Sequence, residues 1–151
     1  MTDRSNPGGW TLDYKLELVL IPVSDVDRAK AFYLEKLGFD LLIDTSVGDG
    51  MRVVQLTPPG SACSIGFGTG LTKAAPGSAE GLHLVVPDVD AARAELVERG
   101  LNVGEMFHMG EGGQAPGPDP ERRDYNSFLP FSDPDGNTWL VQEVRRTASQ
   151  A

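Results

Sequence analysis

The stretch LELVLIPVSDVDRAKAFYLEKLGF, from Leu16 to Phe39, decides the fold. It opens with an almost continuously apolar run from Leu16 to Val23, a pattern typical of a strand covered on both faces. Ser24 or Asp25 can then cap a helix whose apolar residues recur at i, i+3, i+4 and i+7 and form one buried stripe. Gly38 follows, because glycine adopts the left-handed conformation that ends a helix at little cost. The stretch therefore predicts a strand, a helix and a glycine stop in series.

The same series returns 63 residues later. Asp25-Val26-Asp27 aligns with Asp88-Val89-Asp90, and the first strand aligns with residues 81–86. Between the two copies, residues 69–80 are rich in turn-forming residues and predict a linker. Each half alone is near the lower size limit for an independent core, so two modules of one domain fit the 151 residues better than two domains do.

The remaining strands are predicted as short apolar or β-branched runs bounded by turn residues. They are expected over residues 40–46, 51–57, 62–67, 82–86, 103–107, 125–131 and 137–144. A second helix is expected over residues 89–99, and residues 109–123, rich in glycine, proline and charge, predict a flexible loop. The expected units are a flexible N-terminal arm over 1–14, a single domain over 15–145 with modules 15–68 and 81–145 joined by the linker 69–80, and a tail over 146–151.

Composition and charge exclude several classes of protein. Thirteen basic against 22 acidic residues give a net charge of −9, which repels phosphate backbones and anionic membranes. We therefore expect no nucleic-acid or membrane partner. The single cysteine, Cys63, cannot form an internal disulfide and is expected to be a buried structural thiol. No segment reaches the roughly 20 apolar residues of a membrane-spanning helix, so we expect a cytoplasmic protein.

Two βαβββ modules, the motif VSDVDRAKAFYLEKLGF and the ending FSDPDGNTWLVQEV together resemble the vicinal oxygen chelate superfamily, the glyoxalase/bleomycin-resistance fold. The resemblance covers residues 15–145. It implies an α+β fold in which two tandem βαβββ modules form cupped mixed sheets around a pocket, commonly within a homodimer. The linker is long enough that modules exchanged between protomers stay an alternative. This fold carries lyases, epimerases, dioxygenases, thiol transferases and drug-binding proteins, so it does not by itself decide the function.

Enzymes of this superfamily usually hold a divalent metal with His, Glu or Gln from four strands. The resemblance carries the four positions onto Leu18, Gly81, a residue within 62–68, and Leu140. None of these offers a donor atom, and residues 62–68 contain no His, Asp, Glu or Gln. Because a catalytic metal needs at least two or three protein ligands, we expect no cofactor in the inherited place. A divalent metal at a relocated site stays as an alternative.

Two polar residues share the strand parity of the lost ligand positions. His83 follows Gly81 by two residues and Gln142 follows Leu140 by two, so both are expected to line the cup. Leu18, Leu20 and Leu140 are expected to supply its apolar contacts. The imidazole and the amide can hydrogen-bond a ligand, and His83 can also move a proton near neutral pH. The alternative for His83 is a half-buried histidine satisfied by a carbonyl group.

Four residues outside those positions are further candidates. His108 precedes the predicted loop and is either a pocket-rim residue or a solvated strand end. Arg123 and Tyr125 lie where the loop returns to a strand, and they either close over an acidic or aromatic ligand or belong to a surface ion-pair cluster. Trp139 either stacks on a planar ligand or belongs to the core or a dimer interface. Glu143 has the opposite parity from Leu140 and is expected to point away from the cup.

Two functions remain open from the sequence. The first is a metal-independent, homodimeric protein that binds a small organic metabolite or antibiotic in the cup, with the acidic surface favouring cationic ligands. The second is an enzyme of the superfamily, a lyase, isomerase or dioxygenase-like protein. It would use His83 or His108 as the acid-base group with Tyr125 or Gln142 orienting the substrate, or it would use a relocated metal.

Overall fold

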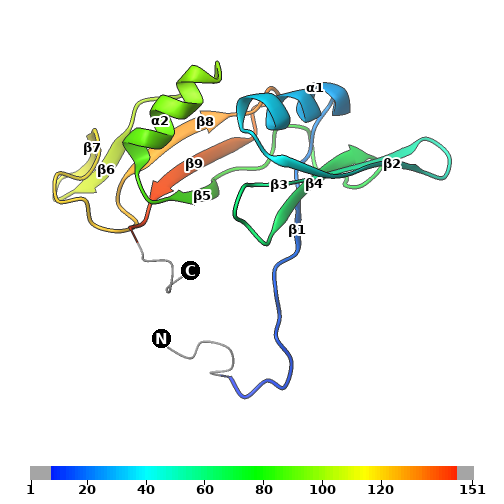
Figure 1. Ribbon diagram of the computed structural model, residues 1–151, viewed down its shortest axis with the longest axis horizontal. Helices are drawn as coiled ribbons and strands as arrows, with labels where there is room; N and C mark the ends of the chain where they lie inside the picture. The colour runs from blue at the N-terminus through cyan, green and yellow to red at the C-terminus, as the bar shows by residue number, and fades with distance from the viewer. Residues whose placement is uncertain (1–7, 146–151) are drawn as a thin grey trace.

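The computed structural model describes residues 8–145, in which two modules lie side by side, the first βαβββ and the second the same with one further strand (Figure 1). The first module contains β1 (Leu18–Leu20), α1 (Val26–Ala31), a π-helical turn η1 (Phe32–Lys36), β2 (Asp40–Val47), β3 (Met51–Thr57) and β4 (Ser64–Thr69). The second contains β5 (Leu82–Val86), α2 (Val89–Glu98), β6 (Phe107–Gly110), β7 (Gly113–Pro116), β8 (Phe128–Ser132) and β9 (Thr138–Glu143). The expected arm over 1–14 lies partly, and the tail over 146–151 wholly, outside the described residues.

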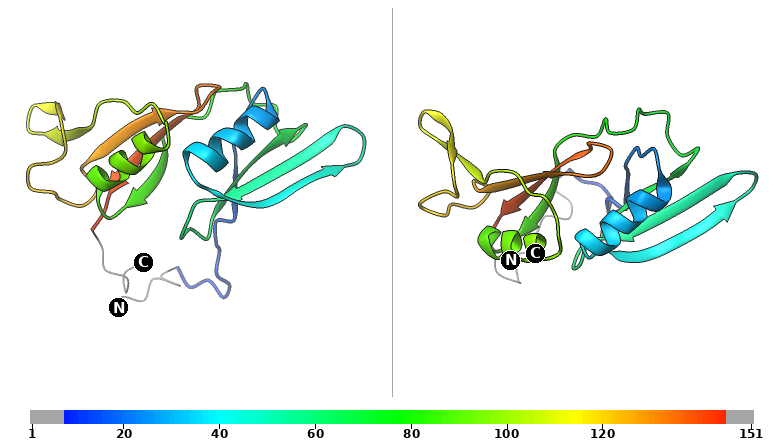
Figure 2. Two further views of the ribbon diagram at one scale, coloured as in Figure 1. Left: turned by 45° about the horizontal axis from the view of Figure 1, so that its top comes forward. Right: turned by 90° about the horizontal axis from the view of Figure 1, so that it is seen from above.

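Each module builds one mixed sheet. The strand orders are β1-β4-β3-β2 and β5-β9-β8-β6-β7. In each sheet the first and last strands of the module, β1 with β4 and β5 with β9, are parallel neighbours, while the other pairs are antiparallel. Both helices cover the same side of the paired sheets (Figures 1 and 2). The α+β fold with two tandem modules, predicted from the sequence, is confirmed.

The repeated aspartates start both helices. Asp25 Oδ1 accepts a hydrogen bond from the Arg28 N–H at 3.0 Å, and Asp88 Oδ1 accepts from two N–H groups of its own first turn at 3.0 and 3.1 Å. After η1, Gly38 adopts a φ of 66°, as the glycine stop predicts. The internal repeat is therefore a repeat of strand, cap and helix.

One hydrophobic core runs through both modules, and Tyr33 stands at its centre. Its buried ring lies 5.8 Å from that of Phe67 on β4 and 5.9 Å from that of Trp139 on β9. Its hydroxyl donates to Asp133 Oδ2 at 2.8 Å and accepts from Trp139 Nε1 at 3.0 Å. Burial, and then the charge of Asp133, raise the pKa of Tyr33 above its ordinary value. The hydroxyl therefore stays protonated and joins the modules.

The turn that follows β8 ties the second module to the first. Asp135 accepts hydrogen bonds from the Oγ and the backbone N–H of Ser24 at 2.5 and 3.1 Å. Asn137 donates to the carbonyl of Pro22 at 2.9 Å and accepts from the N–H of Ala79 at 3.0 Å. Because Asn137 is fully buried, these bonds satisfy polar groups that water does not reach.

The prediction of a first strand covered on both faces is wrong. β1 is three residues long, and its Leu18 and Leu20 side chains are 37% and 40% exposed. Helix α1 covers only one side of the sheet, so the other side of the apolar run faces solvent in a single chain. The apolar run marks a face that the isolated chain leaves open.

The prediction of a flexible loop over residues 109–123 is also wrong. Residues 107–116 form the hairpin β6–β7, in which Met109 pairs with Gln114. The chain then turns around Asp119, whose side chain is fully buried and accepts from Arg123 at 2.8 Å and from Asn126 at 3.0 Å. The glycines and prolines of this segment serve tight turns, and a buried carboxylate holds the turns in place.

Candidate functional site

The face of each sheet that lies opposite the helices forms the cup face. In the second sheet, His83 pairs with Leu140 and Val85 pairs with Gln142, and cross-strand partners share a face. Strands alternate their side chains, so these four residues lie on the cup face. Glu143, one residue further, is fully buried on the helix side. The predicted placement of His83, Gln142 and Leu140 on one face, with Glu143 turned away, agrees with this register.

The first sheet carries a more apolar cup face. Leu18 pairs with Ser64 and Leu20 pairs with Gly66 in the parallel ladder between β1 and β4. A Cβ added at Gly66 would lie 3.0 Å from Leu18 Cδ1 and 3.6 Å from Leu20 Cδ2. The two leucines therefore fill the space above the bare glycine backbone.

The four inherited metal positions do not fit a metal. Leu20 and His83 correspond under the 63-residue repeat, so their ladder partners Gly66 and Leu140 correspond as well. This places the position left open within residues 62–68 at Gly66, next to Leu18 in the first sheet. A leucine or glycine side chain carries no donor atom. Within residues 8–145 no group of three or more His, Cys, Asp or Glu side chains gathers elsewhere.

His83 is exposed on β5 and has a defined hydrogen-bond partner. Its Nδ1 lies 2.6 Å from the carbonyl oxygen of Gly81. A carbonyl only accepts, so Nδ1 carries the hydrogen, and in the neutral form of the ring Nε2 is then the acceptor. Nearby on the cup face, Gln142 Nε2 donates to the carbonyl of Tyr125 at 3.1 Å. The structure thus brings Gln142 and Tyr125 together and puts His83 on the same face.

His108 does not join this group. Phe107 on β6 pairs with Phe128, which pairs in turn with Gln142, so Phe107 lies on the cup face. His108 follows Phe107 and lies on the opposite side of the sheet, where its Nδ1 is 2.8 Å from the carbonyl of Gly117. The two histidines therefore lie on opposite faces of one sheet and cannot share a substrate.

Two other candidates have structural partners. Trp139 is 2% exposed on the helix side, and its ring stacks on that of Phe131 with centroids 5.9 Å apart. The structure places it in the core rather than among ligand-binding residues, because its parity is opposite to that of Leu140. Arg123 forms the ion pair with Asp119, which agrees with the ion-pair alternative.

The expectation of a buried thiol at Cys63 is corrected by the structure. Cys63 is half-buried rather than buried, and its Sγ faces the carbonyl of Ser64 at 3.5 Å.

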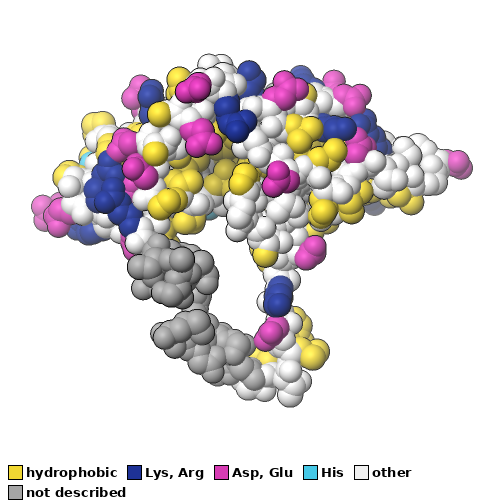
Figure 3. All heavy atoms as spheres, in the orientation of Figure 1, with side chains coloured by type: hydrophobic (Ala, Val, Ile, Leu, Met, Phe, Trp, Pro, Cys, Tyr) yellow, Lys and Arg dark blue, Asp and Glu magenta, His cyan; other side chains and the backbone are white. Residues whose placement is uncertain are grey.

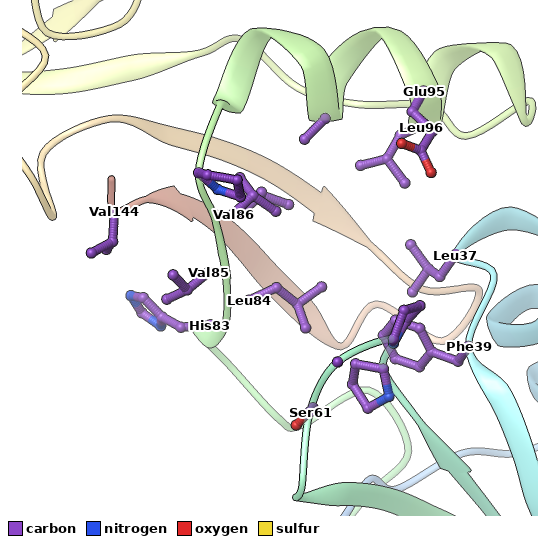
Figure 4. A pocket seen from close by; sticks show the side chains of 16 residues that line it. Leu37, Phe39, Ser61, His83, Leu84, Val85, Val86, Glu95, Leu96 and Val144 are labelled. Carbon is purple, nitrogen blue, oxygen red and sulfur yellow. The ribbon is translucent and has the colours of Figure 1, made fainter. Parts of the chain in front are cut away.

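A cavity of about 700 Å³ lies at the junction of the modules. Figure 4 shows Leu37 and Phe39 facing β5 across it, with Leu96 of α2 along one side and His83 at its edge. The turn over residues 58–61 closes its far end. Its volume is in the range of small-molecule pockets, which run from roughly 300 to 1,000 Å³. Sequence reasoning found His83 but missed Phe39 and the 58–61 turn, because no local pattern places them opposite β5.

Two cupped mixed sheets, backed by helices and joined through one core, define an α+β protein with an open apolar face on each module. A family-wide sequence profile, that of the Glyoxalase/Bleomycin resistance protein/Dioxygenase superfamily, matches residues 15–141. The chain belongs to this superfamily. No helix within residues 8–145 is long and apolar enough to cross a membrane.

Solved structures and one curated protein resemble the chain over most of its length. TnmS3, an antibiotic binding protein from Streptomyces sp. CB03234, is 36% identical, with a TM-score of 0.68, and the match covers 87% of this chain and 96% of TnmS3. A superfamily member from Sphaerobacter thermophilus DSM 20745 is 30% identical, with a TM-score of 0.67 and coverages of 86% and 97%. Protein YetH of Bacillus subtilis (strain 168) is 23% identical over 126 residues, 83% of this chain and 94% of YetH.

Proposed function

We propose that this protein binds a small organic molecule, a metabolite or an antibiotic, on its cup faces and without a metal. The observation that carries the proposal is that Leu18, Gly66 and Leu140 stand where metal ligands would be needed, while His83 and Gln142 offer hydrogen bonds beside them. Apolar walls with a few placed polar groups are what organic ligands require. The likeness to an antibiotic binding protein at 36% identity supports the same class of ligand.

We also propose that two copies of the chain close the cup. In a single chain the cup face of the first sheet is open, and its Leu18, Leu20, Ile43 and Val47 are between 37% and 51% exposed. Contiguous apolar surface of this kind marks an interaction site in soluble proteins. A homodimer would turn two open faces toward each other, and the net charge of −9 would draw cationic ligands to the cup. The lone cysteine, which cannot form an internal disulfide, supports a cytoplasmic location as part of this proposal.

The test is a calorimetric screen of the purified protein against a panel of cationic and aromatic antibiotics and metabolites. Saturable binding is expected, and Leu20→Asp should abolish it because a carboxylate would be buried against the ligand. Val97→Asp is the matched control, since Val97 is 45% exposed on α2 and lies away from the cup. Unchanged binding in Leu20→Asp, or no binding by any compound, would contradict the proposal. Sedimentation of the wild type tests the dimer separately.

An enzyme is the second candidate, and the orientation of His83 favours it. With Nδ1 held by the carbonyl of Gly81, Nε2 is presented as a general base on the face that also carries Gln142. Turnover of any bound compound, followed by NMR, should then show a bell-shaped pH–rate profile. His83→Ala should remove the profile and His108→Ala should keep it, because His108 lies on the other face. Full turnover in His83→Ala would reject this assignment.

A further inference from the structure

Strand β3 carries a glutamine that is buried without belonging to the hydrophobic core. Gln55 is 8% exposed, and its neighbours along the strand, Val54 and Leu56, are fully buried in the core. Because side chains alternate along a strand, Gln55 points away from that core and toward the cup face. The ladder agrees, since Gln55 pairs with Gly66 on β4 and with Ile43 on β2. A primary amide therefore lies within the apolar wall of the cup.

The side-chain amide of Gln55 has no hydrogen-bond partner within residues 8–145. On the same face, the hydroxyls of Thr57 and Ser64 lie 2.7 Å apart and bond to each other. An unpaired amide in a buried place costs free energy that the rest of the fold must offset. The amide is still open to an incoming group. In the described chain, the one side-chain polar atom that is sealed from solvent without a hydrogen bond is Oε1 of Glu143.

Apolar side chains surround this amide on the cup face. On one side, Leu18 and Leu20 fill the space above the bare backbone of Gly66, the cross-strand partner of Gln55. On the other side lies Ile43, which is 40% exposed. Figure 3 shows hydrophobic side chains along the lower border of the β2–β3 hairpin, on the side away from the helices. A single polar group within an apolar surface fixes the orientation of an organic ligand.

The chemistry of a primary amide restricts the group that it can bind. Its oxygen accepts hydrogen bonds and its NH₂ group donates them. An ammonium group only donates and a carboxylate only accepts, so each of them leaves one side of the amide unpaired. A carboxamide or a lactam holds an N–H beside a C=O and therefore satisfies both sides at once. His83 and Gln142 already have one partner each within the chain, so Gln55 has the largest unmet capacity of the three.

We propose that Gln55 selects the ligand of the cup, and that it selects a carboxamide or lactam group. The N–H of that group donates to Oε1 of Gln55, and its C=O accepts from Nε2. The rest of the ligand lies over Leu18, Leu20 and Ile43. The net charge acts on the approach of a ligand, whereas the amide decides which group is bound. This inference rests on the proposed binding function and adds to it the class of ligand and the residue that recognises it.

The first experiment compares two aromatic probes by calorimetry, 2-quinolone and N-methyl-2-quinolone. The methyl derivative keeps the ring and the carbonyl but lacks the N–H. The wild type should bind 2-quinolone about tenfold more tightly, because the methyl derivative leaves Oε1 of Gln55 unpaired. In Gln55→Met, which keeps the length of the side chain and removes the amide, the preference should disappear. Gln114→Met, at an exposed position of the edge strand β7, is the matched control and should keep it. Equal binding of the two probes, or no binding of 2-quinolone, by the wild type would overturn the proposal.

The second experiment changes the selectivity instead of removing it. A carboxyl group forms two hydrogen bonds with 2-aminoquinoline, through the ring nitrogen and the amino group of that probe. Gln55→Glu should therefore bind 2-aminoquinoline about tenfold more tightly than the wild type does. Gln114→Glu is the control with the same change of charge and should show no gain. A folded Gln55→Glu variant without a gain would contradict the proposal. If this variant does not fold, the comparison of the two quinolones in Gln55→Met still decides.

The third experiment needs no ligand. Gln55→Met should raise Tm by about 3 °C, because it replaces an unpaired buried amide by an apolar side chain of the same length. Gln114→Met should leave Tm unchanged. Sedimentation should give the same state of association for Gln55→Met and the wild type. A lower Tm or weaker association in Gln55→Met would overturn the proposal, because the amide would then have a structural partner.

The outcomes separate this inference from the proposed function. If the calorimetric screen finds a ligand that Gln55→Met binds as tightly as the wild type does, the binding function stands and the role of Gln55 is wrong. If no compound of the screen and neither quinolone binds, both proposals are wrong. Binding that depends on Gln55 and on the N–H of the lactam supports both.

Discussion

The first and second modules begin with the same strand, aspartate cap and helix, but they bury different groups beneath that helix. In the first module the helix places Tyr33 in the core, and at the equivalent position in the second module stands Leu96, which is half-buried at the wall of the cavity. In the last strand of each module, the second module has the more buried side chain. Glu143 is fully buried, while its first-module equivalent, Thr69, is exposed.

The difference shows how a duplicated unit becomes one domain. The repeat supplies the local pattern of strand, cap and helix twice, because that pattern depends on spacing and capping alone. The contacts that join the copies come from positions where they diverge. Tyr33 crosses from the first module to Asp133 and Trp139 of the second. The junction is therefore asymmetric, and each divergent pair of positions offers a mutation with a matched control.

The largest effect is expected at the first of these pairs. Tyr33→Ala should lower the free energy of unfolding by about 4 kcal/mol, since a fully buried aromatic ring is lost and Asp133 and Trp139 lose a hydrogen-bond partner. Leu96→Ala should cost about 2 kcal/mol, because Leu96 is only partly buried. Urea denaturation with a constant m-value measures both. Equal losses would mean that the core is not centred on the first helix.

The second pair tests a buried carboxylate. Glu143 Oε2 accepts from the N–H of Val89 at 2.9 Å and from Arg122 at 2.8 Å, and so joins the start of α2 to the loop after β7. Glu143→Ala should cost about 3 kcal/mol, because it leaves the buried N–H of Val89 without its acceptor and removes one of the two carboxylates that pair with Arg122. Thr69→Ala, the equivalent change in the first module, should stay within about 0.5 kcal/mol. If Glu143→Ala also lost less than about 0.5 kcal/mol, water would have replaced the carboxylate as acceptor.

Local features of the sequence predicted much of the fold. The helix caps and the strand over residues 82–86 follow from spacing, capping and period-two alternation, which need no knowledge of the partner strand. The same alternation placed His83 and Gln142 on one face. The alternation also indicates that Trp139 belongs to the core, because Trp139 precedes Leu140 on the strand and its side chain points to the opposite face.

Long-range features were not predictable in this way. The turn around Asp119 is rich in glycine and proline, and only the packing of Ser127 and Asn126 against it shows that it is ordered. The cavity at the module junction depends on bringing Phe39 opposite β5, which are separated by more than 40 residues. An apolar run does not show whether both faces of a strand are covered. In β1 the run predicted two covered faces, but one face is exposed to solvent in the single chain.

The caps that the modules share should give smaller and nearly equal effects. Asp25→Ala and Asp88→Ala should each cost about 1 kcal/mol, the usual value of an N-cap side chain. Asp88 satisfies two backbone N–H groups and Asp25 one, so the loss at Asp88 should be the larger. Thermal unfolding of both variants measures the difference. A loss confined to one of them would show that the repeated aspartates are alike in sequence but not in energy.

The smallest effects are expected in the fall of Tm at acid pH. They concern two carboxylates, one in each module, whose hydrogen-bond partners differ in kind. Hydrogen bonds from Arg123 and then Asn126 hold the pKa of Asp119 well below its ordinary 3.8. Because the folded-state pKa is the lower one, the stabilisation is complete above the ordinary value and is lost as pH falls below it. Asp119→Asn should therefore flatten the fall of Tm in acid. Glu121→Gln, an exposed neighbour, should leave the slope unchanged, and parallel curves for Asp119→Asn and wild type would contradict the prediction.

Asp44 in the first module provides the contrasting case. Arg52 and then Lys30 hold its pKa below the ordinary value as well, but here both partners are charged side chains on the sheet surface. Asp119, in contrast, also accepts from a neutral amide and from backbone N–H groups. Salt at about 1 M reduces the Debye length to roughly 3 Å and screens exposed ion pairs. The acid slope removed by Asp44→Asn should therefore shrink in salt, whereas the slope removed by Asp119→Asn should persist. Equal salt sensitivity would mean that the second-module turn is held by charge alone and not by its hydrogen-bond geometry.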